Sequence, residues 1–157
     1  MLVYLMRHGE ALSEQEDPSR GLTDRGEEKV GNQSDLLAHR FSVLPGHVFH
    51  SSKLRAMQTA SIISKSLPTA PKPVETDGLE PMDDPEIWAR RLETLDRDTL
   101  LVGHLPHLSR LASLLLIWDA GREILTFTPG TVVCLGKSRG WKVEWMINPE
   151  ALKDPGV

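Results

Sequence analysis

The sequence predicts an α/β fold, a three-layer α/β/α sandwich with a mostly parallel central sheet and an antiparallel edge near the C-terminus. Two continuous apolar runs, Leu2 to Met6 and "TLLVGH" at 99–104, are typical of strands that are covered on both faces. Segments between and after these runs carry apolar residues at helical spacing. Because strands alternate with helices along the chain, we expect parallel strands with helices packed against the sheet.

The first half of the chain predicts two strand-to-helix units. After the strand at 2–6 and a polar loop, a helix is expected within 22–41, because small and apolar residues recur there on one face: Gly26, Val30, Ser34, Leu37 and Phe41. Thr23 or Asp24 would cap the start of this helix. The second unit is a short strand in "HVFHSS" at 47–52, followed by a helix in "KLRAMQTASIISKSL" at 53–67 that Pro68 ends.

The second half predicts a loop, two helices and a hairpin. The proline-rich stretch at 68–85 indicates a loop with one short strand near Val74, and a helix should follow at 86–95. A further helix is expected after Pro106, and its apolar face should hold Leu108, Leu111, Leu115 and Trp118. The segments "TVVCLG" and "WKVEWMI" flank a Gly-containing turn, which favours an antiparallel pair at the sheet edge.

Length and composition exclude several classes of protein. The 157 residues suit a single domain over residues 1–157. A net charge of −4 argues against nucleic acid or a membrane surface as a partner. No apolar segment has the features of a signal peptide or the length to span a bilayer, so a cytoplasmic location is expected. The lone Cys134, within a strand-like run, should be a buried and inert thiol.

Charged and polar residues follow three of the predicted strands. Arg7 and His8 follow the first strand, Ser51 to Arg55 the second, and His104 ends the "TLLVGH" run. In parallel α/β sheets ligands bind outside the carboxyl ends of the strands, so we expect these residues to meet in one crevice. Guanidinium groups and helix N-termini suit a compact, highly charged anion, and phosphate fits best.

These residue types also predict a reaction. A neutral imidazole is a nucleophile toward phosphorus when an acceptor such as a backbone carbonyl holds its other nitrogen, and nearby arginines favour the neutral form. We therefore predict that His8 attacks the phosphoryl group, while Arg7, Arg55 and His104 bind its oxygens. His104 and His107, with His8, have a spacing that suits metal ligands, but the two arginines would repel a cation, so we expect neither metal nor cofactor.

Four segments in this order, "LMRHGEA", "GLTDRG", "SSKLRAMQTA" and "LVGHLPHLSRL", resemble the histidine phosphatase superfamily, also called phosphoglycerate mutase-like. The resemblance covers about residues 3–136. It implies that His8, within the Arg-His-Gly motif, is the phosphorylated nucleophile and that Arg7, Arg55 and His104 form the phosphate pocket. It also implies a two-step transfer through a phosphohistidine enzyme without a metal. The short chain, "GHLPHL" and the ending "EWMINP" are most similar to the SixA-type phosphohistidine phosphatases.

Two points stay open in the sequence. Larger members of the superfamily carry a glutamate general acid after the third strand, and here Asp77, Glu80 and Asp83 are the candidates, of which we prefer Glu80. The resemblance to the SixA-type enzymes implies phosphohistidine in a protein as the substrate. The lack of a clearly matching acid is consistent with this, because a phosphoramidate needs less help from an acid than an alkyl ester does. The alternatives are a small phosphate ester or a catalytically silent phosphoprotein-binding module, although the intact His8 argues against such a module.

Overall fold

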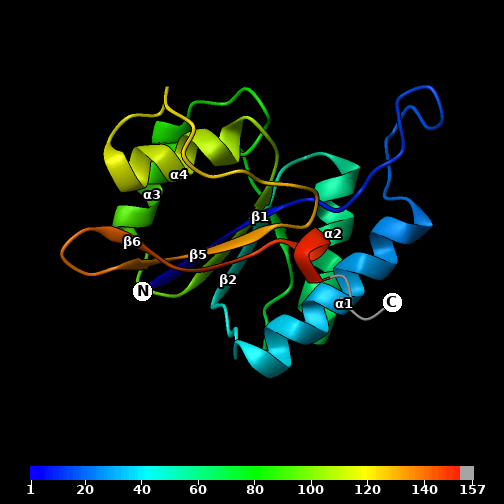
Figure 1. Cartoon of the computed structure of the whole chain (residues 1–157), viewed down its shortest axis with the longest axis horizontal. Helices are drawn as coiled ribbons and strands as arrows, with labels where there is room; N and C mark the ends of the chain where they lie inside the picture. Colours follow the sequence, from blue (N-terminus) through cyan, green and yellow to red (C-terminus); the bar gives the residue numbers. More distant parts are fainter. Residues whose placement is uncertain (153–157) are drawn as a thin grey trace.

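The computed structural model describes residues 1–152 and contains one six-stranded sheet (Figure 1). The strand order is β3-β2-β4-β1-β5-β6. The strands are β1 (Leu2–Arg7), β2 (His47–His50), β3 (Val74–Glu75), β4 (Thr99–Gly103), β5 (Val132–Lys137) and β6 (Trp141–Ile147). The first four strands in this order pair in parallel, whereas β5 pairs antiparallel with both β1 and β6. The predicted fold class, with its antiparallel C-terminal edge, is confirmed.

Two pairs of helices cover the two faces of the sheet (Figure 1). One face carries α1 (Asp24–Arg40) and α2 (Leu54–Ser66), and the other carries α3 (Pro85–Thr94) and α4 (His107–Ile117). A short 3-10 helix, η1 (Pro149–Leu152), follows β6.

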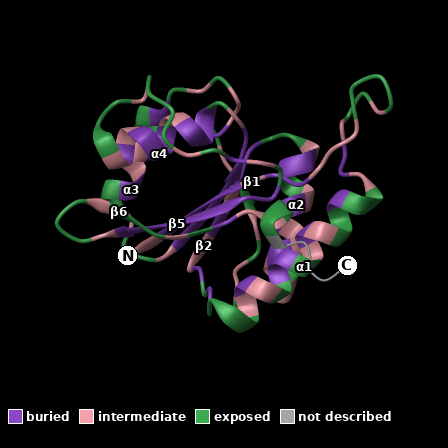
Figure 2. Ribbon diagram, in the orientation of Figure 1, coloured by how far each residue is buried: buried purple, intermediate pink, exposed green. Residues whose placement is uncertain are grey.

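Alternate residues of β1 belong to two different hydrophobic cores. Tyr4 and Met6 pack toward α1 and α2, whereas Val3 and Leu5 pack toward α3 and α4. All four side chains are buried, and Figure 2 shows the central strands as a buried layer between the helices. Burial on both faces explains why the strand is a continuous apolar run rather than an alternating one.

The helix ends show where local chemistry refines the sequence prediction. The Thr23 hydroxyl accepts a hydrogen bond from the Gly26 amide and caps α1, as one of the two predicted caps. Helix α3 begins at Pro85, one residue before the predicted start, because the Asp84 side chain caps it by accepting from the Glu86 amide.

One prediction about α4 is wrong. Trp118 was expected on the apolar face of this helix, but α4 ends at Ile117 and Trp118 adopts the left-handed conformation of a C-cap, with φ of 61°. The helix itself therefore stops before this residue, and the Trp118 side chain is 86% exposed.

Two further predictions concern burial. Cys134 is a free, buried thiol on β5, and burial raises its pKa to about 12, which agrees with the expectation of an inert thiol. Among residues 1–152, no helix is both long enough and apolar enough to cross a membrane.

Candidate active site

The carboxyl ends of β1, β2 and β4 lie at one edge of the sheet and bring the predicted residues together. Arg7 on β1 is the register partner of Gly103 on β4, so His8 and His104 follow neighbouring strands. Their ring centroids are 5.0 Å apart. From the first turn of α2, the Nε of Arg55 approaches the Nε2 of His8 at 3.4 Å. Residues distant in sequence therefore form one cluster, as the strand-end argument predicted.

Backbone hydrogen bonds hold the end of β1 rigidly. The Arg7 amide donates to the Thr131 carbonyl and the His8 amide to the Gly103 carbonyl, each at 3.0 Å. The Gly130 amide in turn lies within hydrogen-bond distance of the carbonyl oxygens of both Arg7 and His8. The strand end is thus held from β4 and from the loop before β5, which limits the movement of both side chains.

The His8 ring is oriented by the backbone of the next residue. Its Nδ1 lies 2.7 Å from the Gly9 carbonyl oxygen, and a carbonyl only accepts, so Nδ1 carries the proton and Nε2 carries the lone pair. Burial lowers the pKa of His8 to about 4, and the charges of Arg55, Arg7 and Arg20 act in the same direction. Near neutral pH this ring is a neutral imidazole with its lone pair toward Arg55, which is the form required of a nucleophile.

Gly9 meets a steric requirement beside this ring. A Cβ atom at Gly9 would lie 2.6 Å from Cγ2 of Val30 on α1, so a larger residue would have to displace the Val30 side chain. The Gly9 amide donates to the hydroxyl of Thr59 at 3.0 Å, and that hydroxyl donates to the Arg55 carbonyl at 2.7 Å. The turn after His8 is therefore packed against α1 and bonded to α2.

The two predicted arginines are buried or half-buried cations without a carboxylate partner. Arg55 is 9% exposed, and neither Arg55 nor Arg7 forms an ion pair with any residue in 1–152. Nη1 of Arg7 donates to the Phe127 carbonyl at 2.8 Å, while its buried Nε has no partner. Burial lowers the pKa of both guanidinium groups. Because an uncompensated buried cation is costly, this arrangement suits a bound anion.

Sequence reasoning missed a third arginine. Arg20 lies in the loop between β1 and α1, and its charge lowers the pKa of both His8 and Arg55. Its Nε donates to the Leu12 carbonyl at 3.0 Å, and its backbone is left-handed with φ of 50°. This loop projects from the body of the molecule, and an antiparallel bridge between Ala11 and Leu22 closes its base (Figure 1). The sequence signal that could have identified Arg20 is a cation directly before "GLTDRG". The position of the Arg20 side chain, however, depends on this loop geometry.

The three candidate acids occupy different environments. Oε1 of Glu80 accepts hydrogen bonds from the amide and hydroxyl of Ser52, and its Oε2 lies 3.8 Å from the Lys53 ammonium. Glu80 thus reaches the residues just before α2, and its charge acts on Arg55. Asp83 accepts from the Glu80 amide at 2.9 Å, whereas the exposed Asp77 pairs with Arg91 of α3 at 2.8 Å. Of the three, Glu80 is the one that contacts the segment carrying Arg55.

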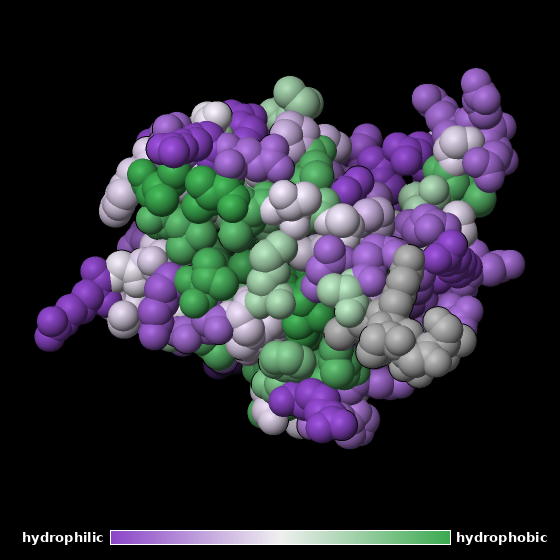
Figure 3. Space-filling view, viewed as in Figure 1, coloured by the Kyte–Doolittle hydropathy of each residue, from purple (hydrophilic) through white to green (hydrophobic). Residues whose placement is uncertain are grey.

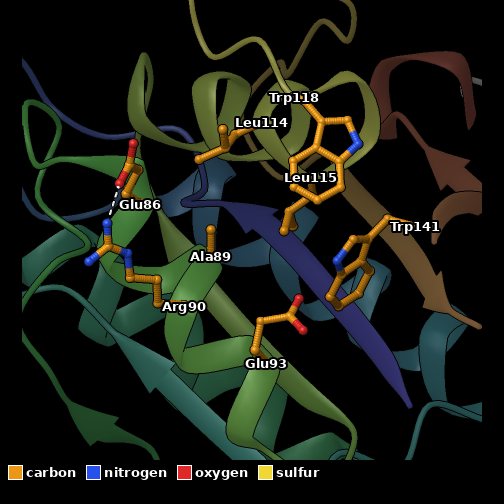
Figure 4. Close-up of a pocket in the computed structure, with 8 residues that line it drawn as sticks. All are labelled: Glu86, Ala89, Arg90, Glu93, Leu114, Leu115, Trp118 and Trp141. Carbon is orange, nitrogen blue, oxygen red and sulfur yellow. Dashed lines mark hydrogen bonds and ion pairs between the residues drawn. The ribbon is translucent and has the colours of Figure 1, made fainter.

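A hollow of about 410 Å³ lies between α3, α4 and β6, away from the titratable cluster (Figure 4). Its walls are mainly apolar, with Leu114, Leu115 and two tryptophans, and hydrophobic surface gathers over these elements in Figure 3. Trp141 begins β6 opposite Lys137 of β5, level with the amino end of β1, whereas His8 follows the carboxyl end of β1. The two carboxylates that line this hollow are in ion pairs, since Glu86 pairs with Arg90 and Glu93 pairs with Lys137. The titratable cluster, not this hollow, is therefore the candidate active site.

His107, the third histidine that the sequence offered as a metal ligand, lies on α4. His107, in the first turn of α4, is fully buried, and neither of its ring nitrogens has a hydrogen-bond partner. Burial lowers its pKa to about 4. In the part of the chain that the structure describes, no group of three or more His, Cys, Asp or Glu side chains is arranged to hold a metal ion.

Comparisons with known proteins agree with this geometry. The profile of the histidine phosphatase superfamily (branch 1) matches residues 3–86, whereas no curated protein matches the sequence. The solved structure of the protein histidine phosphatase SixA complexed with tungstate shares 25% identity and a TM-score of 0.84, covering 98% of this chain and 100% of that chain.

Two other solved structures share the fold at lower identity. A putative phosphohistidine phosphatase SixA from Agrobacterium tumefaciens has 22% identity and a TM-score of 0.76, covering 94% of this chain and 97% of that chain. A putative alpha-ribazole-5'-P phosphatase from Escherichia coli has 18% identity and a TM-score of 0.78, covering 95% and 98%. Since the family profile spans more than half of the sequence and includes Arg7, His8 and Arg55, this chain belongs to branch 1 of the histidine phosphatase superfamily and is a phosphatase of that superfamily.

Proposed function

We propose that this phosphatase hydrolyses phosphohistidine in a protein through a covalent phospho-His8 intermediate. The observation that carries the proposal is the state of His8: a neutral ring, held at Nδ1 by the Gly9 carbonyl, with Nε2 facing Arg55. A lone pair directed toward the buried Arg55 guanidinium is the arrangement needed to attack a phosphoryl group that this guanidinium binds.

The reaction proceeds in two displacements. The Nε2 lone pair of His8 forms a bond to phosphorus, while the bond from phosphorus to the substrate imidazole breaks and the leaving nitrogen takes up a proton. Water then attacks the phosphorus of phospho-His8, the bond to Nε2 breaks, and inorganic phosphate leaves. Arg7 and Arg55, with His104 as a neutral donor, stabilise the charge on the oxygens in both transition states. Arg20 adds a third positive charge near the site.

Two observations favour phosphohistidine as the substrate. The structure of the protein histidine phosphatase SixA matches 98% of this chain and 100% of its own chain, so the two differ by no large insertion. In addition, Ser52 occupies Oε1 of Glu80 with two hydrogen bonds, which leaves Oε2 as the oxygen without a hydrogen-bond partner. A phosphoramidate tolerates a poorly placed acid better than an ester does, because protonated imidazole is a good leaving group.

A small phosphate ester is the second candidate substrate. The structure described as a putative alpha-ribazole-5'-P phosphatase has the same fold, with a TM-score of 0.78, and the proposed nucleophile and phosphate ligands are equally suited to an ester. The preference between phosphohistidine and an ester therefore depends on the leaving group and on the surroundings of the phosphate. A direct comparison of the two substrates measures this preference.

The test is phosphate release from a phosphohistidine-bearing protein and from an aryl phosphate, with chelator present, for wild type and His8→Ala. We expect faster release from the phosphohistidine protein and no turnover by the variant. Preference for the ester would overturn the substrate assignment and retain the mechanism. Tight binding of phosphoprotein without any release would indicate a binding module instead.

A further inference from the structure

A buried serine contacts the second histidine of the site. Ser51 follows β2 and has no exposed surface, and its Oγ lies 2.5 Å from Nε2 of His104. Strands β2 and β4 are neighbours, with His50 opposite Val102, so Ser51 and His104 extend from adjacent strand ends. Ser51 approaches His104 from the β2 side of β4, whereas His8 follows β1 on the other side.

The hydrogen bonds of the Ser51 hydroxyl restrict the position of its proton. The Lys53 amide donates to Oγ of Ser51 at 3.3 Å, and an amide N–H only donates. Within residues 1–152 the remaining partner of Oγ is Nε2 of His104. The other ring nitrogen, Nδ1 of His104, is buried and has no partner. Burial lowers the pKa of this histidine to about 3, so near neutral pH the ring carries one proton.

Two arrangements of protons are possible, and they differ in the number of unsatisfied groups. If Nε2 of His104 donates to Ser51, the serine hydroxyl proton has no acceptor and the Nδ1 lone pair has no donor. If Ser51 donates to Nε2, both of those groups are satisfied and one donor, Nδ1–H, remains without a partner. Because each unsatisfied buried polar group is costly, the second arrangement is favoured.

We propose that Ser51 is a positioning residue that holds His104 as the Nδ1–H tautomer and so reserves this N–H for a phosphoryl oxygen. The proposal rests on the proposed function, in which the phosphoryl group is bonded to His8. The centroids of the His8 and His104 rings are 5.0 Å apart, so His104 is a neighbour of the ring that would carry the phosphoryl group. The bound oxygen would supply the acceptor that Nδ1–H lacks in the ligand-free protein.

Nitrogen NMR of the histidine rings tests this tautomer directly. Protein with ¹⁵N-labelled histidine is compared near pH 7.5 as wild type, Ser51→Ala and Ser113→Ala, with His104→Gln to assign the signals. Ser113 is the matched control, because it is also fully buried and its hydroxyl has no partner. We expect a protonated Nδ1 in wild type and Ser113→Ala, and transfer of at least part of the proton to Nε2 in Ser51→Ala.

Binding of inorganic phosphate and turnover provide the second readout. Loss of one hydrogen-bonded donor should weaken phosphate binding or slow turnover about two- to tenfold in Ser51→Ala, and Ser113→Ala should match wild type. An Nε2–H tautomer in wild type, or an unchanged ring spectrum in Ser51→Ala, would overturn the proposal. If wild type releases no phosphate from either substrate, the proposed function fails, while the ring spectra still decide whether Ser51 sets the tautomer.

Discussion

The ends of β1 and β4 lie side by side, and each is followed by a histidine, but the two rings are held in different ways. His8 is held by the carbonyl of its own neighbour, Gly9. His104 is held by the side chain of Ser51, which follows a third strand. A carbonyl only accepts, so the backbone alone determines the tautomer of His8. A hydroxyl both donates and accepts, so the tautomer of His104 depends on what else binds Ser51.

This difference matches the two tasks that we assign to the rings. The nucleophile must present a lone pair at Nε2. A backbone carbonyl, which can only accept, holds the proton on Nδ1 and so leaves Nε2 unprotonated. The second histidine must present a proton, and a side-chain donor is needed to occupy its other nitrogen. Five predictions test this comparison, from the largest expected effect to the smallest.

Removal of the nucleophile should have the largest effect. His8→Ala should lower turnover about a thousandfold or more, because no other group in the cluster can form the covalent intermediate. Binding of inorganic phosphate should change by only a few fold, since Arg7, Arg55 and His104 remain. Steady-state phosphate release and a phosphate titration measure the two quantities. His39→Ala, at an exposed histidine on α1, is the control, and substantial turnover by His8→Ala would refute the nucleophile assignment.

Stability should fall in acid because three buried histidines are held neutral. The pKa values of His8, His104 and His107 are lowered to about 4, 3 and 4, against about 6.5 in an unfolded chain. Between pH 6.5 and 4 the unfolded chain therefore binds more protons than the folded protein does. The free energy of unfolding should be at its highest above pH 6.5 and should fall by several kcal/mol toward pH 4.

Urea unfolding at several pH values from 7.5 to 4.5 measures this dependence. His107→Leu removes one of the three groups and leaves the His8 and His104 rings in place, so its stability should vary less steeply with pH than that of wild type. Equal slopes for the two proteins would show that His107 is not held neutral in the folded state.

Loss of a phosphate-binding arginine should have an intermediate effect. Arg55→Ala should slow turnover at least tenfold, because a charge-assisted hydrogen bond contributes about 1.5 to 3 kcal/mol. Arg90→Ala is the matched control, since Arg90 is an exposed arginine paired with Glu86 on α3. The kcat/KM of the three proteins on one substrate is the measurement. A loss below threefold in Arg55→Ala would contradict its role in phosphate binding.

The third arginine should contribute less. Arg20 acts on His8 and Arg55 through its charge, and its Nε is already bonded to the Leu12 carbonyl. We expect Arg20→Ala to raise KM roughly threefold and to make binding of inorganic phosphate less sensitive to salt. Arg20→Lys keeps the charge and should recover most of the loss. If Arg20→Ala and wild type bind phosphate equally at low salt, Arg20 is not part of the site.

The residues that sequence reasoning placed correctly share a simple physical origin. Arg7 is the last residue of β1, and His8 and His104 directly follow β1 and β4, whose apolar runs are unmistakable; parallel pairing alone brings those strand ends together. Arg55 follows from the same logic, because α2 begins at Leu54, shortly after β2 ends at His50. Local periodicity and topology were sufficient for these four positions.

Other features depend on tertiary contacts that the sequence does not reveal. Arg20 is placed by a left-handed backbone and by the bridge that closes its loop. Trp118 leaves the helical face because α4 ends in a left-handed residue, although the apolar spacing continues through it. The choice among the acidic residues after β3 depends on a loop in which Asp83 accepts from the Glu80 amide. In each case backbone conformation outside the regular elements decides the outcome.

Glu80 should give the smallest effect on the expected substrate and the clearest distinction between substrates. Glu80→Gln keeps an acceptor for Ser52 but removes the acid, so release from the phosphohistidine protein should fall less than about threefold. Release from the aryl phosphate, and more so from an alkyl phosphate, should fall further, because a poor leaving group needs proton transfer. Asp77→Asn, which alters an exposed carboxylate paired with Arg91, is the control. Equal losses on all three substrates would mean that Glu80 supports the position of Arg55 rather than the leaving group, and the acid would then have to be sought elsewhere.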